Sequence, residues 1–393
     1  MIQRDYLIIG TGIGGASACE GLRKYDKRGS VTIVGAENFH PYKRWILSKS
    51  FLREKEPPIK KIQEYDGRWY DTHKIETRLG TVVAQFNIDR RLAVLGNGES
   101  IEFKKACLAM GSRPVRPPVA GVNLGNVIYL RSVRDALALR EMATLEKNVM
   151  VVGGGLLAAE AASSLRMMKL KVTVMHRNAY LLNRYLDPQT GTWLTEYFSK
   201  HGITMLMGES LNGFEGKTVL RNIQTKSGNR VPAGLAVVAC GAEPNLDLVR
   251  NTPLSGPHGS PVTDYLETEE KGIYAVGDLA FYPDRLMGGV RRQTHWENAR
   301  AQGLIAGANM TGKKRIRYEQ IPHFSTEMFD LTLHFIGDFS LQPSRIDLAG
   351  AYPKKKFTIR YYQGDKLRGI LLCNRTAHEV DLAMKQLRQA LGR

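Results

Sequence analysis

The feature that most constrains this chain is a glycine-rich turn that directly follows an apolar run at residues 7–9. The turn reads Gly10-x-Gly12-x-x-Gly15, and a stretch of helical composition follows it. The first glycine permits the tight turn, the second lets the backbone approach a pyrophosphate, and the third lets the helix pack on the strand. The free N–H groups at the start of that helix bind phosphate oxygens. With an apolar strand at residues 31–34, the pattern predicts a β-α-β unit that binds a dinucleotide.

The same pattern appears a second time in the middle of the chain. An apolar strand at residues 149–152 precedes Gly153-x-Gly155-x-x-Ala158, and a helical stretch and another strand at residues 171–175 follow. Because the chain has 393 residues, it is long enough for two or three domains. The repeat therefore predicts an α/β protein with two dinucleotide-binding domains that hold two nucleotides face to face.

Cysteine usage and hydropathy exclude several classes of protein. The four cysteines are far apart and form no C-x-x-C pair, so we predict neither a metal site nor a redox-active dithiol. Cys19 lies on the first predicted helix, and Cys107 and Cys240 lie in apolar strands, so all three are expected to be buried, inert thiols. No apolar run approaches the roughly 18 residues of a membrane span, and we see no signal peptide. We therefore expect a cytoplasmic protein without a membrane span.

The net charge is the unusual feature of the composition. The chain has 56 Lys and Arg against 38 Asp and Glu, which gives a formal net charge of +18 at pH 7. Such a charge produces a long-range field that attracts an acidic partner. Nucleic acid is the competing partner, but we find no recognised nucleic-acid motif and no aromatic residues interleaved with the basic clusters. An acidic protein partner is therefore favoured.

Five further segments, together with the two glycine turns, give the chain a family resemblance. They are HPYKRWILSKSF from residue 40, ACLAMGSRP from residue 106, ACGAEPNLDL from residue 239, GIYAVGDLA from residue 272 and RRQTHWENARAQG from residue 291. In this order they resemble the FAD-dependent pyridine nucleotide–disulfide oxidoreductase superfamily, and most closely its ferredoxin reductase-like branch. That branch also includes rubredoxin reductases and apoptosis-inducing factor.

The resemblance implies a glutathione reductase-like fold, in which two Rossmann-like dinucleotide-binding domains are accompanied by a small α+β C-terminal domain. The predicted domains are an FAD-binding domain at residues 1–117 and 245–317, an NAD(P)H-binding domain at 118–244 and a C-terminal interface domain at 318–393. Two alternating strands around Gly364 and an amphipathic final stretch agree with the last of these.

The resemblance also implies which residues bind FAD. They come from the first glycine turn, the segment from residue 37, several strand ends and the helix that begins near residue 295. The expected residues are Gly10, Gly12, Ile13, Gly14, Gly15, Glu37, Arg44, Lys49, Val83, Ala109, Gly111, Arg113, Gly277, Asp278, His295 and Trp296. Asp278 would bind the ribityl-phosphate region, and Glu37 is the acidic residue nearest to the position that binds the FAD ribose in relatives.

The NAD(P)H site is expected at the second glycine turn and the strand ends beside it. Its residues are Gly153, Gly155, Leu156, Leu157, Glu160, His176, Arg177, Arg184, Cys240 and Gly241. In relatives, the carboxylate that Glu160 matches pairs with the lysine that Lys49 matches, beside the nicotinamide. We therefore predict that Lys49 and Glu160 are the catalytic residues and form an ion pair close to the flavin, since neither charge should be buried alone.

The second unit departs from the NAD-type pattern beside the adenosine ribose. NAD-type relatives have an acidic residue at the position of His176, whereas this chain has His176, Arg177 and Arg184 and no acidic residue before Asp187. A carboxylate would repel a 2′-phosphate, whereas Arg and His can bind one. The sequence therefore favours NADPH over NADH.

The resemblance implies an oxidoreductase that passes electrons from NAD(P)H through FAD to a small electron-transfer protein, such as an acidic [2Fe–2S] ferredoxin or a rubredoxin. Two alternatives stay open. A regulatory flavoprotein resembling apoptosis-inducing factor would oxidise NAD(P)H slowly and use the basic surface for nucleic acid. A disulfide or peroxide reductase would need a cysteine beside the flavin, and the segment from residue 40 has none. The sequence is compatible with a monomer or a homodimer.

Overall fold

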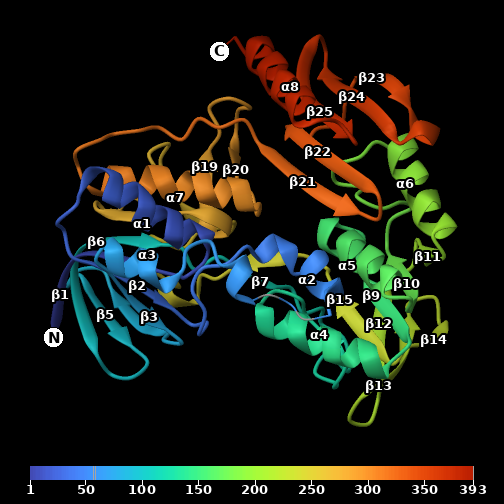
Figure 1. Cartoon of the computed structure of the whole chain (residues 1–393), viewed down its shortest axis with the longest axis horizontal. Coiled ribbons are helices and arrows are strands. Elements are labelled where there is room, and N and C mark those ends of the chain that lie inside the picture. Colours follow the sequence, from blue (N-terminus) through green and yellow to red (C-terminus); the bar gives the residue numbers. More distant parts are fainter. Residues whose placement is uncertain (56, 58, 393) are drawn as a thin grey trace. The chain divides into compact units, whose positions relative to one another are not determined.

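The chain folds into two units, which the computed structural model describes over residues 1–55, 57 and 59–392 (Figure 1). Unit 1 carries the first glycine turn and unit 2 carries the second. Unit 1 consists of Met1–Lys43, Ile59–Arg113 and Pro244–Pro322, and unit 2 consists of Arg44–Pro58, Pro114–Glu243 and His323–Arg393. At two of the points where the chain passes from one unit to the other, it does so within a short strand. These strands are β7 (Ser112–Pro114) and β16 (Ala242–Pro244).

Unit 1 is built on a largely parallel sheet with the strand order β3-β2-β1-β6-β5-β4. β1 pairs in parallel with β2 and β6, and the last part of β6 pairs in parallel with β18. The strands are β1 (Ile2–Ile9), β2 (Val31–Gly35), β3 (Ile75–Leu79), β4 (Val83–Asn87), β5 (Leu92–Leu95), β6 (Ser100–Leu108) and β18 (Ile273–Ala275). Ile9, Leu108 and Ala275 are level with one another, so three strands end together at the edge where the first glycine turn begins.

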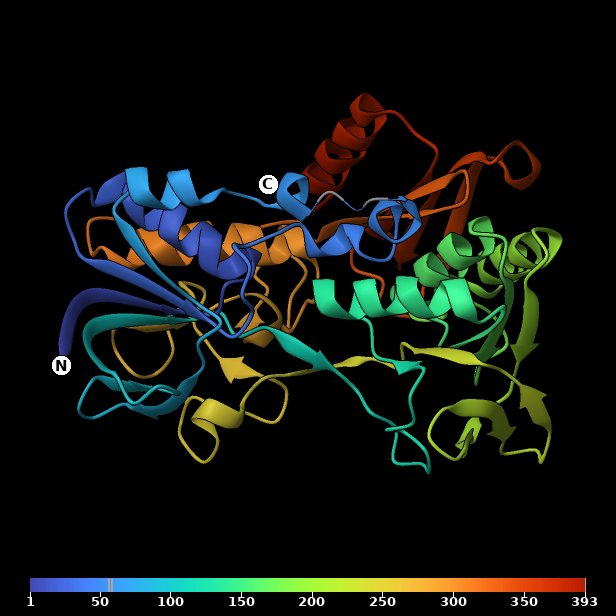
Figure 2. The same ribbon diagram turned by 60° about the horizontal axis from the view of Figure 1, so that its bottom comes forward.

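Helix α1 (Ile13–Tyr25) follows β1 and packs against α7 (Trp296–Met310), as Figures 1 and 2 both show. Glycines make this contact close. A methyl group at Gly307 would lie 2.0 Å from the carbonyl oxygen of Ala18, and one at Gly21 would lie 2.1 Å from that of Leu304. The two helix backbones are therefore in direct contact.

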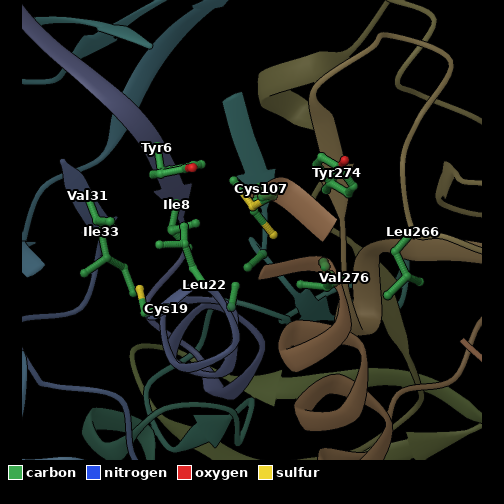
Figure 3. Close-up of a cluster of buried hydrophobic side chains, with 14 of the residues drawn as sticks. Tyr6, Ile8, Cys19, Leu22, Val31, Ile33, Cys107, Leu266, Tyr274 and Val276 are labelled. Carbon is green, nitrogen blue, oxygen red and sulfur yellow. The ribbon is translucent and has the colours of Figure 1, made fainter. Parts of the chain in front are cut away.

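The core of unit 1 includes a cluster of buried side chains from β1, β2 and α1 (Figure 3). Ile8, Leu22 and Ile33 are fully buried there, together with Cys19 and Cys107. Burial raises the pKa of the Cys19 thiol to about 12 and also raises the pKa of the Cys107 thiol. These two cysteines are the buried thiols that the sequence predicts.

Unit 1 also contains a short α-helix and a small sheet with the strand order β17-β19-β20. Their bounds are α3 (Gly67–Thr72), β17 (Ser260–Pro261), β19 (Ala280–Pro283) and β20 (Val290–Arg291).

Unit 2 contains a second parallel sheet, with the strand order β11-β10-β9-β15-β8. Its centre repeats the centre of unit 1, because β9 pairs in parallel with both β10 and β15. A three-stranded antiparallel sheet with the order β12-β13-β14 belongs to the same unit. The elements are α2 (Ser50–Arg53), β8 (Val127–Ile128), α4 (Val133–Leu145), β9 (Asn148–Val152), α5 (Leu156–Met167), β10 (Lys171–His176), α6 (Pro188–Lys200), β11 (Thr204–Met207), β12 (Leu211–Gly216), β13 (Leu220–Thr225), β14 (Arg230–Pro232) and β15 (Leu235–Val238).

The C-terminal part of unit 2 is an antiparallel sheet with the strand order β21-β22-β25-β24-β23, and α8 packs on it. The elements are β21 (His323–Met328), β22 (Leu331–Gly337), β23 (Arg345–Ala351), β24 (Lys356–Gln363), β25 (Lys366–Cys373) and α8 (Ala377–Ala390). Trp193 of α6 stacks on Tyr352 with ring centroids 5.3 Å apart, and the Tyr361 hydroxyl donates a hydrogen bond to Asp187 at 2.9 Å. These contacts place the C-terminal sheet and the second parallel sheet in one unit, and the division into three domains stays a prediction.

The two parallel sheets with their glycine turns confirm the predicted α/β class with two Rossmann-like regions. Among the helices of the described residues, none has the length and the apolar character needed to cross a membrane.

Candidate functional site

The first glycine turn joins β1 to α1, and each of its three glycines is there for a different reason. At Gly10 the backbone φ is +118°, and a methyl group there would lie 2.1 Å from the carbonyl oxygen of Ala109. At Gly15 a methyl group would lie 2.0 Å from the carbonyl oxygen of Gly10. At Gly12 no atom of the described residues, apart from the adjacent backbone, lies within 4 Å of the methyl position. Gly12 is also the N-cap of α1 and provides no side-chain cap, so the first N–H groups of the helix are available to a ligand.

The second glycine turn joins β9 to α5 and repeats this geometry. Gly153 has φ +135°, and a methyl group there would lie 2.3 Å from the carbonyl oxygen of Ala239. Gly155 is the N-cap of α5, and beyond its adjacent backbone no atom in the part of the chain that the structure describes lies within 4 Å of its methyl position. Ala158 replaces the third glycine and is fully buried. The chain therefore has two open backbone cradles, each at the start of a long helix without a side-chain cap.

Several predicted FAD-site residues lie at the edge of the unit 1 sheet, beside the first cradle. Ala109 and Gly111 follow the end of β6, and Asp278 follows the end of β18. The Asp278 side chain is 8% exposed and accepts a hydrogen bond from Ser112 Oγ at 2.6 Å. The Arg292 guanidinium donates to the main-chain oxygen of Asp278 at 3.2 Å. The strand ends and the first glycine turn thus share one polar edge of the sheet.

Three other predicted FAD-site residues of unit 1 have partners of their own. Glu37, two residues beyond β2, accepts a hydrogen bond from the Tyr42 hydroxyl at 2.6 Å. An acidic residue at this end of the second strand suits a ribose hydroxyl in such units. Arg113 forms an exposed ion pair with Asp247. Val83 packs against the core cluster that includes strands β1 and β2.

The start of α7 presents both an uncapped helix terminus and an unpaired donor. His295 is the N-cap of α7 and makes no side-chain cap, and desolvation lowers its pKa to about 4, so the imidazole is neutral at pH 7. Trp296 follows, and within the described part of the chain its buried Nε1 has no hydrogen-bond partner. A buried donor without a partner is costly, so both features fit an acceptor group on a bound molecule.

Lys49 and Glu160 form a buried ion pair within unit 2. Lys49 Nζ lies 3.0 Å from Glu160 Oε1, and the two residues are 6% and 8% exposed. Thr326 Oγ1 donates to the same Oε1 at 2.6 Å, and Ser48 Oγ donates to Oε2 at 2.5 Å. Both carboxylate oxygens are therefore satisfied, as a buried charge requires. The predicted pairing is confirmed, and its closeness to the flavin stays a prediction.

Helix α5 also fixes the backbone next to Lys49. Ser164 lies one turn after Glu160, on the same face of α5, and its hydroxyl donates to the main-chain oxygen of Ser48 at 2.7 Å. Lys49 is the N-cap residue of the short helix α2. One helix therefore holds the main chain before the lysine and binds its ammonium group.

Two arginines bind main-chain oxygens around this segment. Arg140 of α4 donates to the carbonyl oxygens of Phe51 and Leu52 at 3.0 and 2.7 Å, near the end of α2. Arg44, which is predicted to contact FAD, donates to the carbonyl oxygen of Arg131 at 2.8 Å. The sequence did not reveal that Ser48, Arg140 and Thr326 belong to this site, although Ser48 lies in the segment HPYKRWILSKSF.

The cations beside the second cradle differ in what they can bind. The His176 ring covers the turn, because a methyl group on Gly154 would lie 2.3 Å from it. His176 Nε2 lies 3.0 Å from Asn183 Oδ1, and desolvation lowers the pKa of the imidazole. Arg177 and Arg184 are exposed, and with the residues that the structure describes they form neither an ion pair nor a hydrogen bond. The two arginines, rather than His176, are therefore the cations available to an anion.

The other residues predicted for the NAD(P)H site lie at the start of α5 and after β15. Leu156 and Leu157 begin α5, and Cys240 and Gly241 follow the end of β15. Cys240 is exposed, so the prediction of a buried thiol was wrong for this residue. The physical reason is that β15 ends at Val238, which leaves Cys240 in the loop beyond the buried strand.

Comparison with known proteins agrees with this geometry. Residues 4–303 match the family described as pyridine nucleotide-disulphide oxidoreductase. Monodehydroascorbate reductase 4, peroxisomal, of Arabidopsis thaliana is 30% identical over 351 residues, which are 85% of this chain and 72% of that protein. Rhodocoxin reductase of Rhodococcus erythropolis is 29% identical over 372 residues, which are 94% of this chain and 86% of that protein. A chain in the crystal structure of the covalent putidaredoxin reductase–putidaredoxin complex is 27% identical with a TM-score of 0.92, over 98% of this chain and 93% of that one.

The chain belongs to the pyridine nucleotide-disulphide oxidoreductase family, in the ferredoxin reductase-like branch that its motifs predict. It is an oxidoreductase, and the family implies FAD and NAD(P)H as its cofactors. The residues present fit two dinucleotides. The methyl positions of Gly12 and Gly155 are open, and neither helix start has a side-chain cap.

The open position at Gly155 gives a prediction that separates binding from folding. In Gly155→Ala the added methyl meets none of the described residues beyond its own backbone, but it occupies the space where a pyrophosphate would approach the helix start. We expect a melting temperature within about 2 °C of wild type and a Kd for NAD(P)H raised about tenfold or more, which calorimetry measures. FAD content should not change.

Gly153→Ala is the contrasting variant, because its methyl would overlap the Ala239 carbonyl oxygen and lower stability. Unchanged coenzyme affinity in Gly155→Ala would contradict the assignment of this cradle.

Proposed function

We propose that this protein is an FAD-dependent oxidoreductase that takes electrons from NADPH and passes them, through FAD, to a small electron-transfer protein such as a [2Fe–2S] ferredoxin or a rubredoxin. The observation that carries the proposal is the presence, in one chain, of two open dinucleotide cradles and a buried Lys49–Glu160 pair. FAD supplies the chemistry that links a two-electron hydride donor to one-electron acceptors. A cytoplasmic location is part of the proposal.

In this proposal, FAD occupies the first cradle and NADPH the second. The first helix start and Asp278 bind FAD, with Arg44 and Lys49 supplying positive charge toward it. Lys49 and Glu160 are the catalytic residues, and their buried pairing holds the ammonium group in one place. The remaining residues predicted for each site keep the roles given above as part of the proposal.

The preference for NADPH is supported by the two exposed arginines after β10. Arg177 and Arg184 have no ion-pair partner among the residues described, so their charge is available to a 2′-phosphate. A guanidinium binds a phosphate through paired, charge-assisted hydrogen bonds. His176 contributes as a neutral ring packed on the turn rather than as a cation.

The nature of the acceptor is supported by charge and by the names of relatives. Several relatives are reductases of ferredoxin, putidaredoxin or rubredoxin. The net charge of +18 favours an acidic carrier. A plant relative is named a monodehydroascorbate reductase, so a small organic radical is the second candidate acceptor.

Removal of the Arg177 guanidinium is expected to weaken the use of NADPH selectively. Charge-assisted hydrogen bonds are worth roughly 1.5–3 kcal/mol, so Arg177→Ala should lower kcat/KM for NADPH about ten- to a hundredfold and leave NADH nearly unchanged. Steady-state kinetics with both coenzymes measure this.

Arg221→Ala is the matched control, because it removes an exposed cation from β13 of the same unit. A wild-type preference for NADH, or an equal loss of kcat/KM with both coenzymes in Arg177→Ala, would contradict the proposed binding of the 2′-phosphate by Arg177.

The rate of electron transfer to the carrier protein is expected to depend strongly on the salt concentration. Anaerobically reduced protein, mixed with an acidic [2Fe–2S] ferredoxin in a stopped-flow instrument, should reduce it with a rate constant that falls about tenfold or more from low to high ionic strength. Reduction of the monodehydroascorbate radical without any reduction of ferredoxin or rubredoxin would favour the small-molecule acceptor. Salt-sensitive DNA binding with negligible reduction of every acceptor would favour the regulatory alternative.

A further inference from the structure

Thr326 brings a hydroxyl group to the Lys49–Glu160 pair from a strand that carries no cofactor motif. It lies on β21, which contacts α5 within unit 2 (Figure 1), and it is 1% exposed. Its neighbours on the same side of the strand, Phe324 and Met328, are buried and apolar, whereas the alternate residues are more exposed. Valine would serve packing equally well at this position, so the hydroxyl needs another explanation.

That explanation is the coordination of the carboxylate. Glu160 Oε1 accepts from Lys49 Nζ at 3.0 Å and from the Thr326 hydroxyl at 2.6 Å, and Oε2 accepts from Ser48 at 2.5 Å. The lysine stem is flexible, so its ammonium group alone would not fix the plane of the carboxylate. Two short hydroxyl donors, one on each oxygen, fix that plane, and the carboxylate in turn fixes Nζ.

The strand that carries Thr326 is itself held firmly within unit 2. Tyr361 of the same sheet donates to Asp187, the N-cap of α6, at 2.9 Å. At the turn after β21, Asp330 accepts a hydrogen bond from the Tyr197 hydroxyl of α6. The Thr326 hydroxyl is therefore presented from an anchored sheet, not from a loose segment.

We infer that Thr326 is a positioning residue for the Lys49–Glu160 pair, through which the C-terminal sheet sets the orientation of the two catalytic groups. The inference rests on the proposed function and adds a residue to it. The Thr326 hydroxyl is uncharged and donates a hydrogen bond to the Glu160 carboxylate, so its role is to orient that group and not to transfer a proton. Its contribution is to the rate of hydride acceptance, not to the binding of the coenzyme.

The test compares FAD-loaded Thr326→Val, Thr326→Ser and Thr358→Val proteins with wild type. Valine keeps the shape but removes the donor, and serine keeps the donor. Thr358, on β24 of the same sheet, is the matched control, because its hydroxyl has no hydrogen-bond partner among the residues described.

The limiting rate of flavin reduction at saturating NADPH, measured by stopped flow, should fall about tenfold in Thr326→Val, which corresponds to about 1.4 kcal/mol. The Kd for NADPH should stay within about twofold. The flavin of the Thr326→Ser and Thr358→Val proteins should be reduced at rates close to that of wild type. A wild-type rate in Thr326→Val, or an equal loss in Thr326→Ser, would overturn the inference.

A second measurement does not depend on turnover. Urea unfolding of the FAD-loaded Thr326→Val, Glu160→Gln and double variants should show non-additive effects, with a coupling of about fivefold or more in the unfolding equilibrium constant. Additive effects would overturn the inference.

Failure of the proposed function gives a different result. A wild-type protein that binds FAD but is reduced by neither coenzyme would refute that function, and with it the role of Thr326 in hydride acceptance.

Discussion

The buried carboxylate of Glu160 is the constraint on which the candidate site depends. Removing such a charge from water costs several kcal/mol unless partners replace the solvent. The hydroxyl partners are Ser48 and Thr326, which lie 112 and 166 positions away in the sequence. The charge is therefore satisfied only when the segment before α2, helix α5 and the C-terminal sheet are all folded together. This requirement explains why the C-terminal sheet belongs to the site and is not merely an appendage of the fold.

The two glycine turns impose a constraint of a different kind. They present backbone N–H groups, so what matters is how closely another molecule can approach the main chain. Gly10 and Gly153 shape the turns through positive φ angles, and Gly12 and Gly155 leave the approach open. In both units, the strands next to the one that precedes the glycine turn are parallel to it, so their ends lie beside the turn. Binding by main-chain groups and control of charge by buried side chains are thus separate tasks, carried out by neighbouring residues on α5.

Features that depend on local spacing could be predicted from the sequence. The glycine turns and the strands before them were predicted from such spacing, whereas the Lys49–Glu160 pair was predicted from the family resemblance of the two segments that carry it. Thr326 was not, since its partner lies in another segment and a single threonine in an apolar strand has no distinctive spacing. Cys240 was placed wrongly, because an apolar run does not reveal where its strand ends.

The charge state of His176 was also beyond the sequence. The residues around it, which are basic, suggested a cation. In the structure, however, the imidazole packs on the glycine turn and contacts Asn183, and desolvation favours its neutral form. Such an effect depends on what surrounds a side chain, and that is decided by the fold. The outline of each nucleotide site could therefore be predicted, whereas the details that tune its charges could not.

The central claim is that the buried ion pair acts on the flavin, and a crystal structure of the protein with bound FAD tests it most directly. The measured quantity is the distance from Lys49 Nζ to the nearest polar atom of the isoalloxazine ring. We expect a hydrogen-bond distance, about 3.5 Å or less, with the pairing to Glu160 kept. A structure in which FAD occupies the first cradle while Lys49 and Glu160 lie far from the ring would contradict the account.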